Sequence, residues 1–277
     1  MGARELIVDV GMHTGRDAEF YLRKGFDVFA IEADVDLARV AAERLAGWVA
    51  AGRLTIREVA IAPHDGEVRF FANPGHNDWG TISEKMVRRN ERQGEPSQAR
   101  TVPAVRFERL LDELGRVPYY VKIDIEGADQ LCLDALHSCE RPPSYVSVET
   151  SLDSREEAER QFTTLRDLGY DAFKIVNQRL NARYVCPDPP REGAFVPARF
   201  DTLTSGPFGE ETPGSWLPFD KAWRRYRRIL FEQRVLGVSG LLGATPLAPL
   251  YSRVRRRLLG APLGWYDLHA RHADVER

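Results

Sequence analysis

The feature that most constrains the fold is a glycine-bounded loop between an apolar strand and a helix near the start of the chain. Residues 6–10 are apolar and mostly β-branched except for Asp9, which is typical of a strand buried on both faces. The loop runs from Gly11 to Gly15, and a helix is expected to follow. A second apolar strand then ends on Glu32. This strand–loop–helix–strand unit predicts an α/β fold.

The same unit has a chemical meaning. Glycines let a backbone approach a ligand closely, and a helix N-terminus offers unpaired N–H groups. An acid at the end of the second strand, here Glu32, can accept two hydrogen bonds from a ribose diol. We therefore expect a nucleoside-containing ligand across the strand ends. The simpler alternative is an ordinary turn whose glycines only allow packing.

The spacing of the glycines bears on the kind of nucleoside ligand. Dinucleotide sites favour G-x-G-x-x-G, whereas this loop has Gly11 and Gly15 with three residues between them. The third glycine is missing, and no G-K-[S/T] occurs nearby. An NAD-linked oxidoreductase is therefore disfavoured.

Length and composition indicate a globular protein. A chain of 277 residues with 43% hydrophobic residues suits one α/β domain with additions. No signal peptide is expected at the N-terminus, because the first residues lead directly into a strand. The uncharged residues 237–251 are too few to span a bilayer. Three cysteines without C-x-x-C spacing favour a reduced, cytoplasmic compartment.

Charge is distributed unevenly along the chain. Residues 221–277 hold 12 Lys or Arg against 4 Asp or Glu, although the whole chain has a net charge of −2. This basic extension on an acidic body indicates either an anionic partner or substrate, or a helical face that docks on the body.

The segment between the first unit and residue 100 offers several candidates. Residues 54–61 are expected to form a third strand, with a fourth over residues 68–71 beside it. The following loop carries His76 and Trp79, which suit either a functional loop or a cover for the core. Residues 84–100 are strongly charged, and we expect a solvated helix or a gating lid.

A second informative stretch begins at Tyr119. The expected buried strand carries Lys122 and Asp124, and Glu126 follows it. Buried charges are costly unless they are paired, so a structural Lys122–Asp124 pair is one explanation. We favour a functional carboxylate at the sheet edge where open α/β sheets bind ligands.

The rest of the chain is expected to complete the sheet. A strand over residues 145–148 ends on Glu149, and a helix covers residues 156–168. Strands at 170–176 and 183–186 are expected to pair as a hairpin that closes the sheet. A long Pro- and Gly-rich connection over residues 187–218 then leads to a basic helix.

Three stretches together resemble the FkbM family of methyltransferases over roughly residues 6–177. They are Asp9-Val-Gly-Met-His-Thr-Gly15, Ala30-Ile-Glu32 and Val121-Lys-Ile-Asp-Ile-Glu-Gly-Ala-Asp129. The resemblance implies a Rossmann-like class I methyltransferase fold, a three-layer sandwich around a mostly parallel, seven-stranded sheet. It also implies S-adenosylmethionine as cofactor and methylation of a hydroxyl on a sugar, glycan or secondary metabolite.

The resemblance implies which residues would contact the cofactor, and the loss of a proton from the attacking hydroxyl leads us to name candidate bases as well. Glu32 would bind the ribose, and Ala60 and Ile61 would lie near adenine. Asp124 would contact the cofactor and act as the first-choice base, with Glu126 and His76 as further catalytic candidates. The residues expected beside the methionine end are Asp9, Gly11, His13 and Gly15. We expect no metal site, although Asp124 with Glu149 is a less favoured cation pair. His269 is expected to pack in the core or, less readily, to contact the substrate.

The expected organisation is a methyltransferase domain over residues 1–186 and an irregular, helical extension over residues 187–277. The extension would supply substrate or oligomer contacts, so an anionic acceptor and a homo-oligomer are both compatible with it. One alternative is a non-catalytic nucleoside-binding module with a basic docking tail. Another is an RNA methyltransferase, although no aromatic and basic platform lies near the motifs.

Overall fold

The structure is a computed structural model that describes residues 4–236, 253, 257 and 264–275. The uncharged stretch at residues 237–251 lies outside the described residues, as do Arg255 and Arg256 of the basic extension. Within the described ranges, no helix is both long and apolar enough to cross a membrane.

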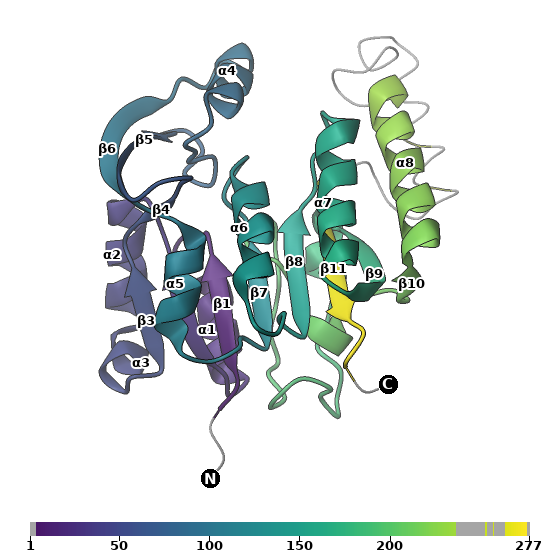
Figure 1. The fold of residues 1–277 in the computed structure, drawn as a ribbon, viewed down its shortest axis with the longest axis horizontal. Helices are drawn as coiled ribbons and strands as arrows, with labels where there is room; N and C mark the ends of the chain where they lie inside the picture. The colour runs from purple at the N-terminus through teal and green to yellow at the C-terminus, as the bar shows by residue number, and fades with distance from the viewer. Residues whose placement is uncertain (1–3, 237–252, 254–256, 258–263, 276–277) are drawn as a thin grey trace.

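A main sheet of eight strands forms the centre of the molecule (Figure 1). Its spatial order is β10-β9-β11-β8-β7-β1-β2-β3, and the neighbouring pairs among β8, β7, β1, β2 and β3 are parallel. β11 is antiparallel to β8 and β9, and β10 is antiparallel to β9. The bounds are β1 Leu6–Val10, β2 Asp27–Ile31, β3 Leu54–Arg57, β7 Tyr120–Ile123, β8 Tyr145–Glu149, β9 Tyr170–Asn177, β10 Leu217–Pro218 and β11 Tyr266–His272.

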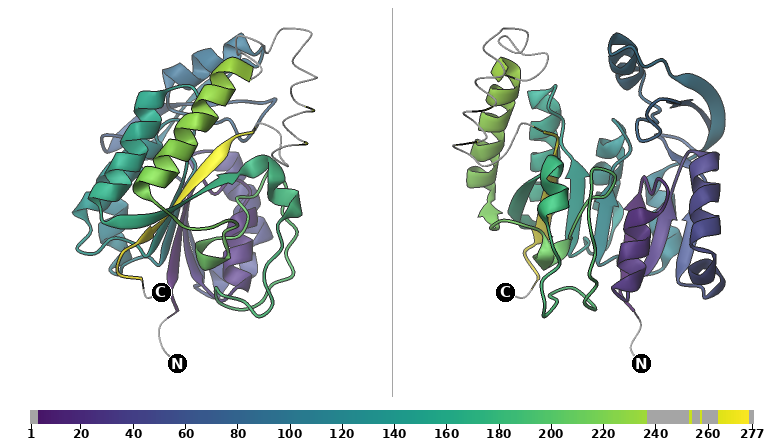
Figure 2. Two further views of the ribbon diagram at one scale, coloured as in Figure 1. Left: turned by 90° about the vertical axis from the view of Figure 1, so that its right-hand side faces the viewer. Right: turned by 180° about the vertical axis from the view of Figure 1, so that it is seen from behind.

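Helices cover both faces of this sheet and give three layers (Figures 1 and 2). The apolar sides of α5 (Phe107–Leu114), α6 (Asp129–Ala135), α7 (Arg155–Asp167) and α8 (Phe219–Leu236) belong to one core cluster. Apolar residues of α1 (Arg16–Arg23) and α2 (Val35–Arg44) belong to a second cluster, and the short α3 (Ala46–Ala50) follows α2. The expected Rossmann-like α/β class with a mostly parallel sheet is therefore confirmed. The two-residue strand β10 makes the sheet one strand larger than the seven expected.

The Pro- and Gly-rich connection packs against the sheet although it has little regular structure. Within residues 187–218, all of which the structure describes, the one helical turn is the 3-10 turn η3 (Gly209–Glu211). Two other 3-10 turns lie outside it, η1 (Leu136–Ser138) after α6 and η2 (Gln178–Arg183) after β9. Phe208 is fully buried, and its ring stacks on that of Tyr120 with centroids 5.1 Å apart. This segment therefore covers part of the face that α1 and α2 leave open.

The sheet does not close as the sequence predicted. The strand expected at residues 183–186 is wrong, because η2 ends at Arg183 and the chain continues without regular structure. Between β8 and β9 lies β11, near the end of the chain, with Leu268 opposite Ile175 on one side and Val148 on the other. Leu268 and Ala270 are fully buried. Residues on both sides of the proposed domain boundary at 186 thus build one sheet, and that boundary stays a prediction.

A second sheet forms an arm at one end of the main sheet. Its three strands have the order β4-β6-β5, with bounds β4 Ala60–Ile61, β5 Gly66–Ala72 and β6 Gln98–Val105. The strand expected over residues 54–61 is therefore split between the two sheets, and the expected pairing of residues 68–71 with it is wrong, because β5 pairs with β6. The charged segment 84–100 forms α4 (Glu84–Arg92) and the start of β6.

Candidate active site at the carboxyl ends of the parallel strands

A cavity of about 500 Å³ lies where the carboxyl ends of the main strands face the arm. The strand ends supply Gly11, Glu32, Asp124 and Glu149, and β11 supplies Asp267 at its beginning. The arm includes the loop after β5 and helix α4, and it supplies residues 76–82 and Arg89. The cavity therefore occupies the edge at which parallel α/β sheets bind ligands.

The glycines of the first loop have packing reasons for being glycine. Gly11 has φ +83°, and a Cβ there would lie 1.8 Å from the backbone oxygen of Asp124. Gly15 has φ +75°, and a Cβ would lie 2.9 Å from Cδ1 of Leu45. Gly11 lines the cavity, whereas Gly15 does not. The first glycine thus lets the ends of β1 and β7 approach each other, and the second lets α1 pack against α2.

Glu32 lies at the end of β2 with its carboxylate oriented by backbone donors. The N–H of His13 donates to Oε2 at 2.7 Å, and the N–H of Asp34 donates to Oε1 at 2.9 Å. Burial raises the pKa of Glu32 to about 7 despite these two hydrogen bonds. His13 lines the cavity with a φ of 55°, and its Nε2 is buried without a hydrogen-bond partner in the described chain. Both residues therefore border the expected nucleoside site.

Asp9 lies behind the cavity and does not line it. It is fully buried, and its Oδ1 lies 3.3 Å from the Lys122 ammonium. The same ammonium donates to the Gly11 carbonyl at 2.8 Å and lies 3.7 Å from Asp124 Oδ2. Burial raises the pKa of Asp9 to about 6, against the attraction of Lys122. Asp9 therefore acts on the cavity through Lys122, as a partner of the cation that holds the loop after β1.

Lys122 is the charge that joins these groups. Burial by itself would lower the pKa of Lys122, but the carboxylates of Asp9, Asp124 and Asp17 together raise it. The lysine therefore stays charged. Lys122 is thus paired, as the structural explanation for charges in this strand requires. Asp124 also lines the cavity, and its functional role stays a prediction.

Asp124 and Glu126, two of the catalytic candidates, stand on the turn after β7. The Asp124 side chain is 46% exposed and lines the cavity. Glu126 is 13% exposed, and its Oε2 accepts from Arg89 Nη2 at 3.1 Å. Burial raises the pKa of Glu126 to about 8 in spite of that arginine. Asp129 closes the turn, since its carboxylate accepts from the N–H groups of Ile125 and Gly127, each at 3.0 Å.

His76, the third catalytic candidate, comes from the arm. Its ring stacks on Trp79 with centroids 4.1 Å apart, and its Nε2 lies 3.8 Å from Glu95 Oε1. Ala60 and Ile61 line the same cavity from β4, beside Phe70. The small residues expected near adenine thus reach the cavity from the arm's sheet.

Glu149 lines the cavity, whereas His269 does not. Burial, followed by the nearby carboxylates of Glu126 and Asp124, raises the pKa of Glu149 well above its usual range. His269 is 2% exposed on β11, and burial lowers its pKa to about 3. The packed role expected for His269 is confirmed. Among the residues that the structure describes, no group of three His, Cys, Asp or Glu is arranged to hold a metal ion.

Several cavity residues come from the C-terminal segment and were not predicted. Gln178 donates to Asp267 Oδ2 at 2.5 Å, and Trp265 lies beside them. Residues 202–205 close another side, where the Ser205 N–H donates to both carboxylate oxygens of Asp17. No motif marks these residues, because the fold brings them to the cavity from distant parts of the chain.

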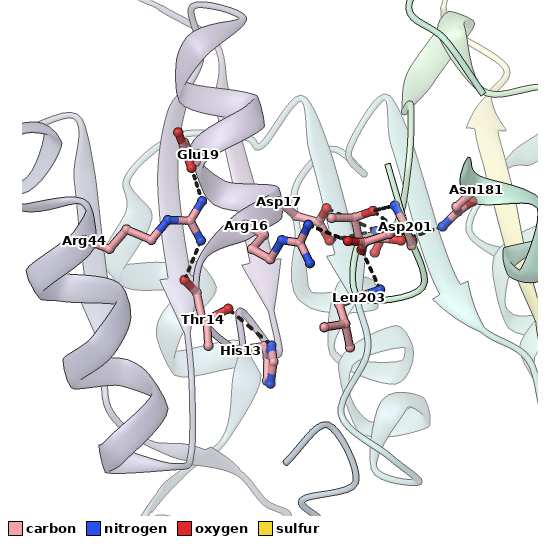
Figure 3. A network of polar contacts seen from close by, with 11 residues as sticks. His13, Thr14, Arg16, Asp17, Glu19, Arg44, Asn181, Asp201 and Leu203 are labelled. Carbon is pink, nitrogen blue, oxygen red and sulfur yellow. Dashed lines mark hydrogen bonds and ion pairs between the residues drawn. The ribbon is translucent and has the colours of Figure 1, made fainter. Parts of the chain in front are cut away.

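A polar network fixes the loop after β1 to this segment (Figure 3). Arg16 Nη2 donates to Asp201 Oδ2 at 2.6 Å. On the other side, Arg44 of α2 donates to the Thr14 carbonyl and pairs with Glu19 of α1. The loop that borders the cavity is thus held between α2 and the segment around residue 201.

The fold and the site together indicate a class of protein. An acid after the second strand of a parallel sheet, beside a cavity at the strand ends, is typical of α/β proteins that bind nucleosides. Residues 9–173, which are 165 of the 277 residues, match the model of the methyltransferase FkbM domain. The chain therefore belongs to the FkbM methyltransferase family, and the resemblance stated from its motifs is confirmed.

Comparison with solved structures finds proteins of low sequence identity to this chain. The FkbM methyltransferase from Methylobacillus flagellatus is 17% identical, with a TM-score of 0.36, and the match covers 53% of this chain and 33% of that one. The precorrin-6y C5,15-methyltransferase from Geobacter metallireducens is also 17% identical, with a TM-score of 0.37, and covers 64% of this chain and 69% of that one. Among curated proteins, none matches the chain. The family assignment rests on the match over residues 9–173.

Proposed function

We propose that this methyltransferase uses S-adenosylmethionine to methylate a hydroxyl oxygen of a small molecule or carbohydrate. The observation that carries the proposal is the Glu32 carboxylate, which faces the cavity at the end of β2 with both oxygens oriented by backbone N–H groups. Each oxygen keeps a lone pair for a ribose hydroxyl. This arrangement suits the nucleoside end of the cofactor within a family of methyltransferases.

The other cavity residues fit such a cofactor. A volume of about 500 Å³ is within the range of small-molecule sites. Ala60 and Ile61 offer an apolar wall for a flat base, and Gly11 and His13 line the same cavity. The unpartnered Nε2 of His13 can bind a polar group of the ligand. The residues present therefore fit the cofactor, and Gly15 and Asp9 would support its site without touching it.

When bound, S-adenosylmethionine supplies an electrophilic methyl group on a sulfonium. The protein must orient the acceptor and exclude water, and it must also accept the proton that a hydroxyl loses as its oxygen attacks. Asp124 suits that task, since its half-exposed carboxylate faces the cavity and lies 3.7 Å from the Lys122 ammonium. Asp124 would accept the proton of the acceptor hydroxyl while the acceptor oxygen bonds to the methyl carbon, whose bond to sulfur breaks and leaves S-adenosylhomocysteine.

The remaining catalytic candidates suit that step less well. Glu126 accepts a hydrogen bond from Arg89, and a pKa of about 8 keeps much of it protonated near neutral pH. His76 is stacked on Trp79 in the arm. We propose Glu126 as the residue that links the arm to the turn after β7, and His76 as a wall of the acceptor site.

The acceptor class is supported by the carboxylates around Asp124. Glu126, Glu149 and Asp267 line the same cavity, and carboxyl groups are good partners for hydroxyls. The basic extension also suggested an anionic acceptor. Such an acceptor would have to keep its negative charge away from these carboxyl groups, because like charges repel. A cytoplasmic location and a homo-oligomer stay predictions from the sequence.

Replacement of Asp124 by asparagine tests the proposed base. Asp124→Asn keeps the shape and removes the charge, so we expect kcat to fall roughly 100-fold while the cofactor affinity drops only modestly. The assay measures S-adenosylhomocysteine release with methyl glycosides, phenols and aliphatic alcohols, and with the corresponding amines. Asp112→Asn on the exposed side of α5 is the matched control.

Each other result has a defined meaning. Transfer to amines alone would contradict hydroxyl methylation, and an unchanged kcat in Asp124→Asn would contradict the base. No turnover with any acceptor, despite cofactor binding, would favour a non-catalytic module. Loss of activity in EDTA that Mg²⁺ restores would instead make Asp124 and Glu149 cation ligands.

A further inference from the structure

Helix α8 has two unlike sides. On the inner side Ala222, Tyr226 and Ile229 are buried in the core cluster of the sheet. The Tyr226 hydroxyl lies 3.1 Å from the carbonyl oxygens of both Thr150 and Ser151, which follow β8. Figures 1 and 2 show α8 outside α7, as the outermost helix on this side of the molecule. The helix is therefore docked by its apolar face, and its opposite face is left for solvent or a partner.

The outward face carries one aromatic residue among arginines. Phe231 is 66% exposed, which is unusual for so large an apolar side chain. Arg224, Arg227, Arg228 and Arg234 are all exposed and lie seven, four and three positions before it and three after it. Residues at these spacings share one side of a helix. The outward side is thus a cationic surface with an apolar centre.

These arginines are not what attaches α8 to the acidic body. Within the described chain, no carboxylate lies at ion-pair distance from Arg224 or Arg227, and Arg228 pairs only with Glu232 of its own helix. Nor does any residue of α8 line the cavity in the part of the chain that the structure describes. The arginines of this surface therefore neither dock the helix on the body nor attract an acceptor into the cavity, so another role is needed to explain them.

The chemistry of the surface selects its partner. Arginines at this density attract phosphates, and a protruding phenylalanine gains free energy only where it leaves water. Single-stranded nucleic acids favour grooves with several aromatic platforms, whereas a helix surface is convex and has one ring here. A lipid surface accepts both groups, because arginines bind headgroup phosphates while an aromatic ring enters the headgroup boundary. In the sequence, the 15 residues that follow α8, residues 237–251, carry no charge.

We propose that the outward face of α8 binds the surface of membranes that contain anionic phospholipids, with Phe231 inserted between the headgroups and the surrounding arginines on the phosphates. The binding is peripheral and reversible, since one aromatic residue and a few charges give modest affinity. This surface would hold the protein at a lipid bilayer while the cavity stays on a different part of the molecule.

Sedimentation of the full chain with lipid vesicles tests this binding. One set contains phosphatidylcholine alone, and the other contains about a third phosphatidylglycerol. We expect binding to the anionic vesicles only, weakening as NaCl rises from about 50 to 500 mM. Removal of arginines in Arg224→Gln with Arg227→Gln should weaken binding roughly 5-fold per charge. Phe231→Ser should weaken it about 10-fold and keep the salt dependence.

The matched control removes two arginines elsewhere. Arg39→Gln with Arg155→Gln also removes two positive charges, from exposed arginines on α2 and α7. This control should bind the vesicles as the wild type does. Circular dichroism and cofactor calorimetry establish that each variant is folded, which separates this proposal from the methyltransferase proposal. Equal binding to neutral vesicles, equal loss in the control, or no binding to anionic vesicles would overturn the inference. If polyuridylate displaces the protein from anionic vesicles at a phosphate concentration equal to that of the lipid, the surface would be assigned to RNA instead.

Discussion

At the scale of single residues, burial raises the pKa of carboxyl groups both in the site, at Glu32 and Glu126, and away from the cavity, at Glu192. Burial raises the pKa of Glu32 and Glu192 to about 7 and that of Glu126 to about 8. The carboxylates are therefore stabilised by directed donors, such as the N–H of His13 on Glu32 and the phenol of Tyr119 on Glu192, without full compensation for lost hydration.

These raised values fix the sign of the pH dependence of stability. The folded protein holds protons that the unfolded chain releases near pH 4.5, so this part of the free energy of unfolding is present at low pH and lost as pH rises through about 7 to 8. We expect the Tm of the ligand-free protein to fall between about pH 5 and pH 8 in melts followed by circular dichroism. Glu126→Gln should flatten this slope, whereas the exposed Glu43→Gln should not. A Tm that rises over this interval would contradict the account.

At the scale of elements, the arm is joined to the turn after β7 through Glu126. Arg89 of α4 donates to the Glu126 carboxylate at 3.1 Å, and its guanidinium lies 5.4 Å from the centre of the Trp79 ring. The Thr81 hydroxyl donates to the Glu126 carbonyl at 2.6 Å. The segment that the sequence suggested as a lid therefore has a defined attachment beside the proposed base.

Loss of this attachment should loosen the arm. Arg89→Met keeps the length of the side chain but removes a charge-assisted hydrogen bond of about 1.5–3 kcal/mol. We expect backbone amides over residues 76–92 to exchange with deuterium roughly 10-fold faster or more, measured by mass spectrometry. Arg88→Met is the matched control, because its pair with Glu84 is exposed and contributes little. Equal exchange in both variants would show that Arg89 does not hold the arm.

At the scale of the whole molecule, the sequence predicted the local units well and their long-range pairing poorly. β1, β2 and β7 are short apolar runs ended by glycine or acid, so their type and their ligand edge could be predicted. β11 lies between β8 and β9 although 88 residues separate Asn177 from Tyr266, and no local pattern specifies such a pairing.

The site was predictable to the same extent. Glu32 follows β2 and Asp124 follows β7, so the position of a charge at a strand end predicts both residues. Gln178, Ser205 and Asp267 reach the cavity only through the placement of β11 and the irregular segment. Gly15 shows the opposite case, since its motif position suggested ligand contact while its surroundings in the structure are Leu45 and Ala41.

The central claim is that the cavity binds S-adenosylmethionine with Glu32 on its ribose, and titration calorimetry at pH 8 tests it directly. Wild type should bind S-adenosylmethionine, and NAD should give no measurable heat. Glu32→Gln should weaken binding by about 1–3 kcal/mol, since it removes hydrogen bonds to a charged group. The control Glu43→Gln, exposed on α2, should bind as the wild type does. Equal affinity of Glu32→Gln and wild type, or binding of NAD in place of S-adenosylmethionine, would contradict the account.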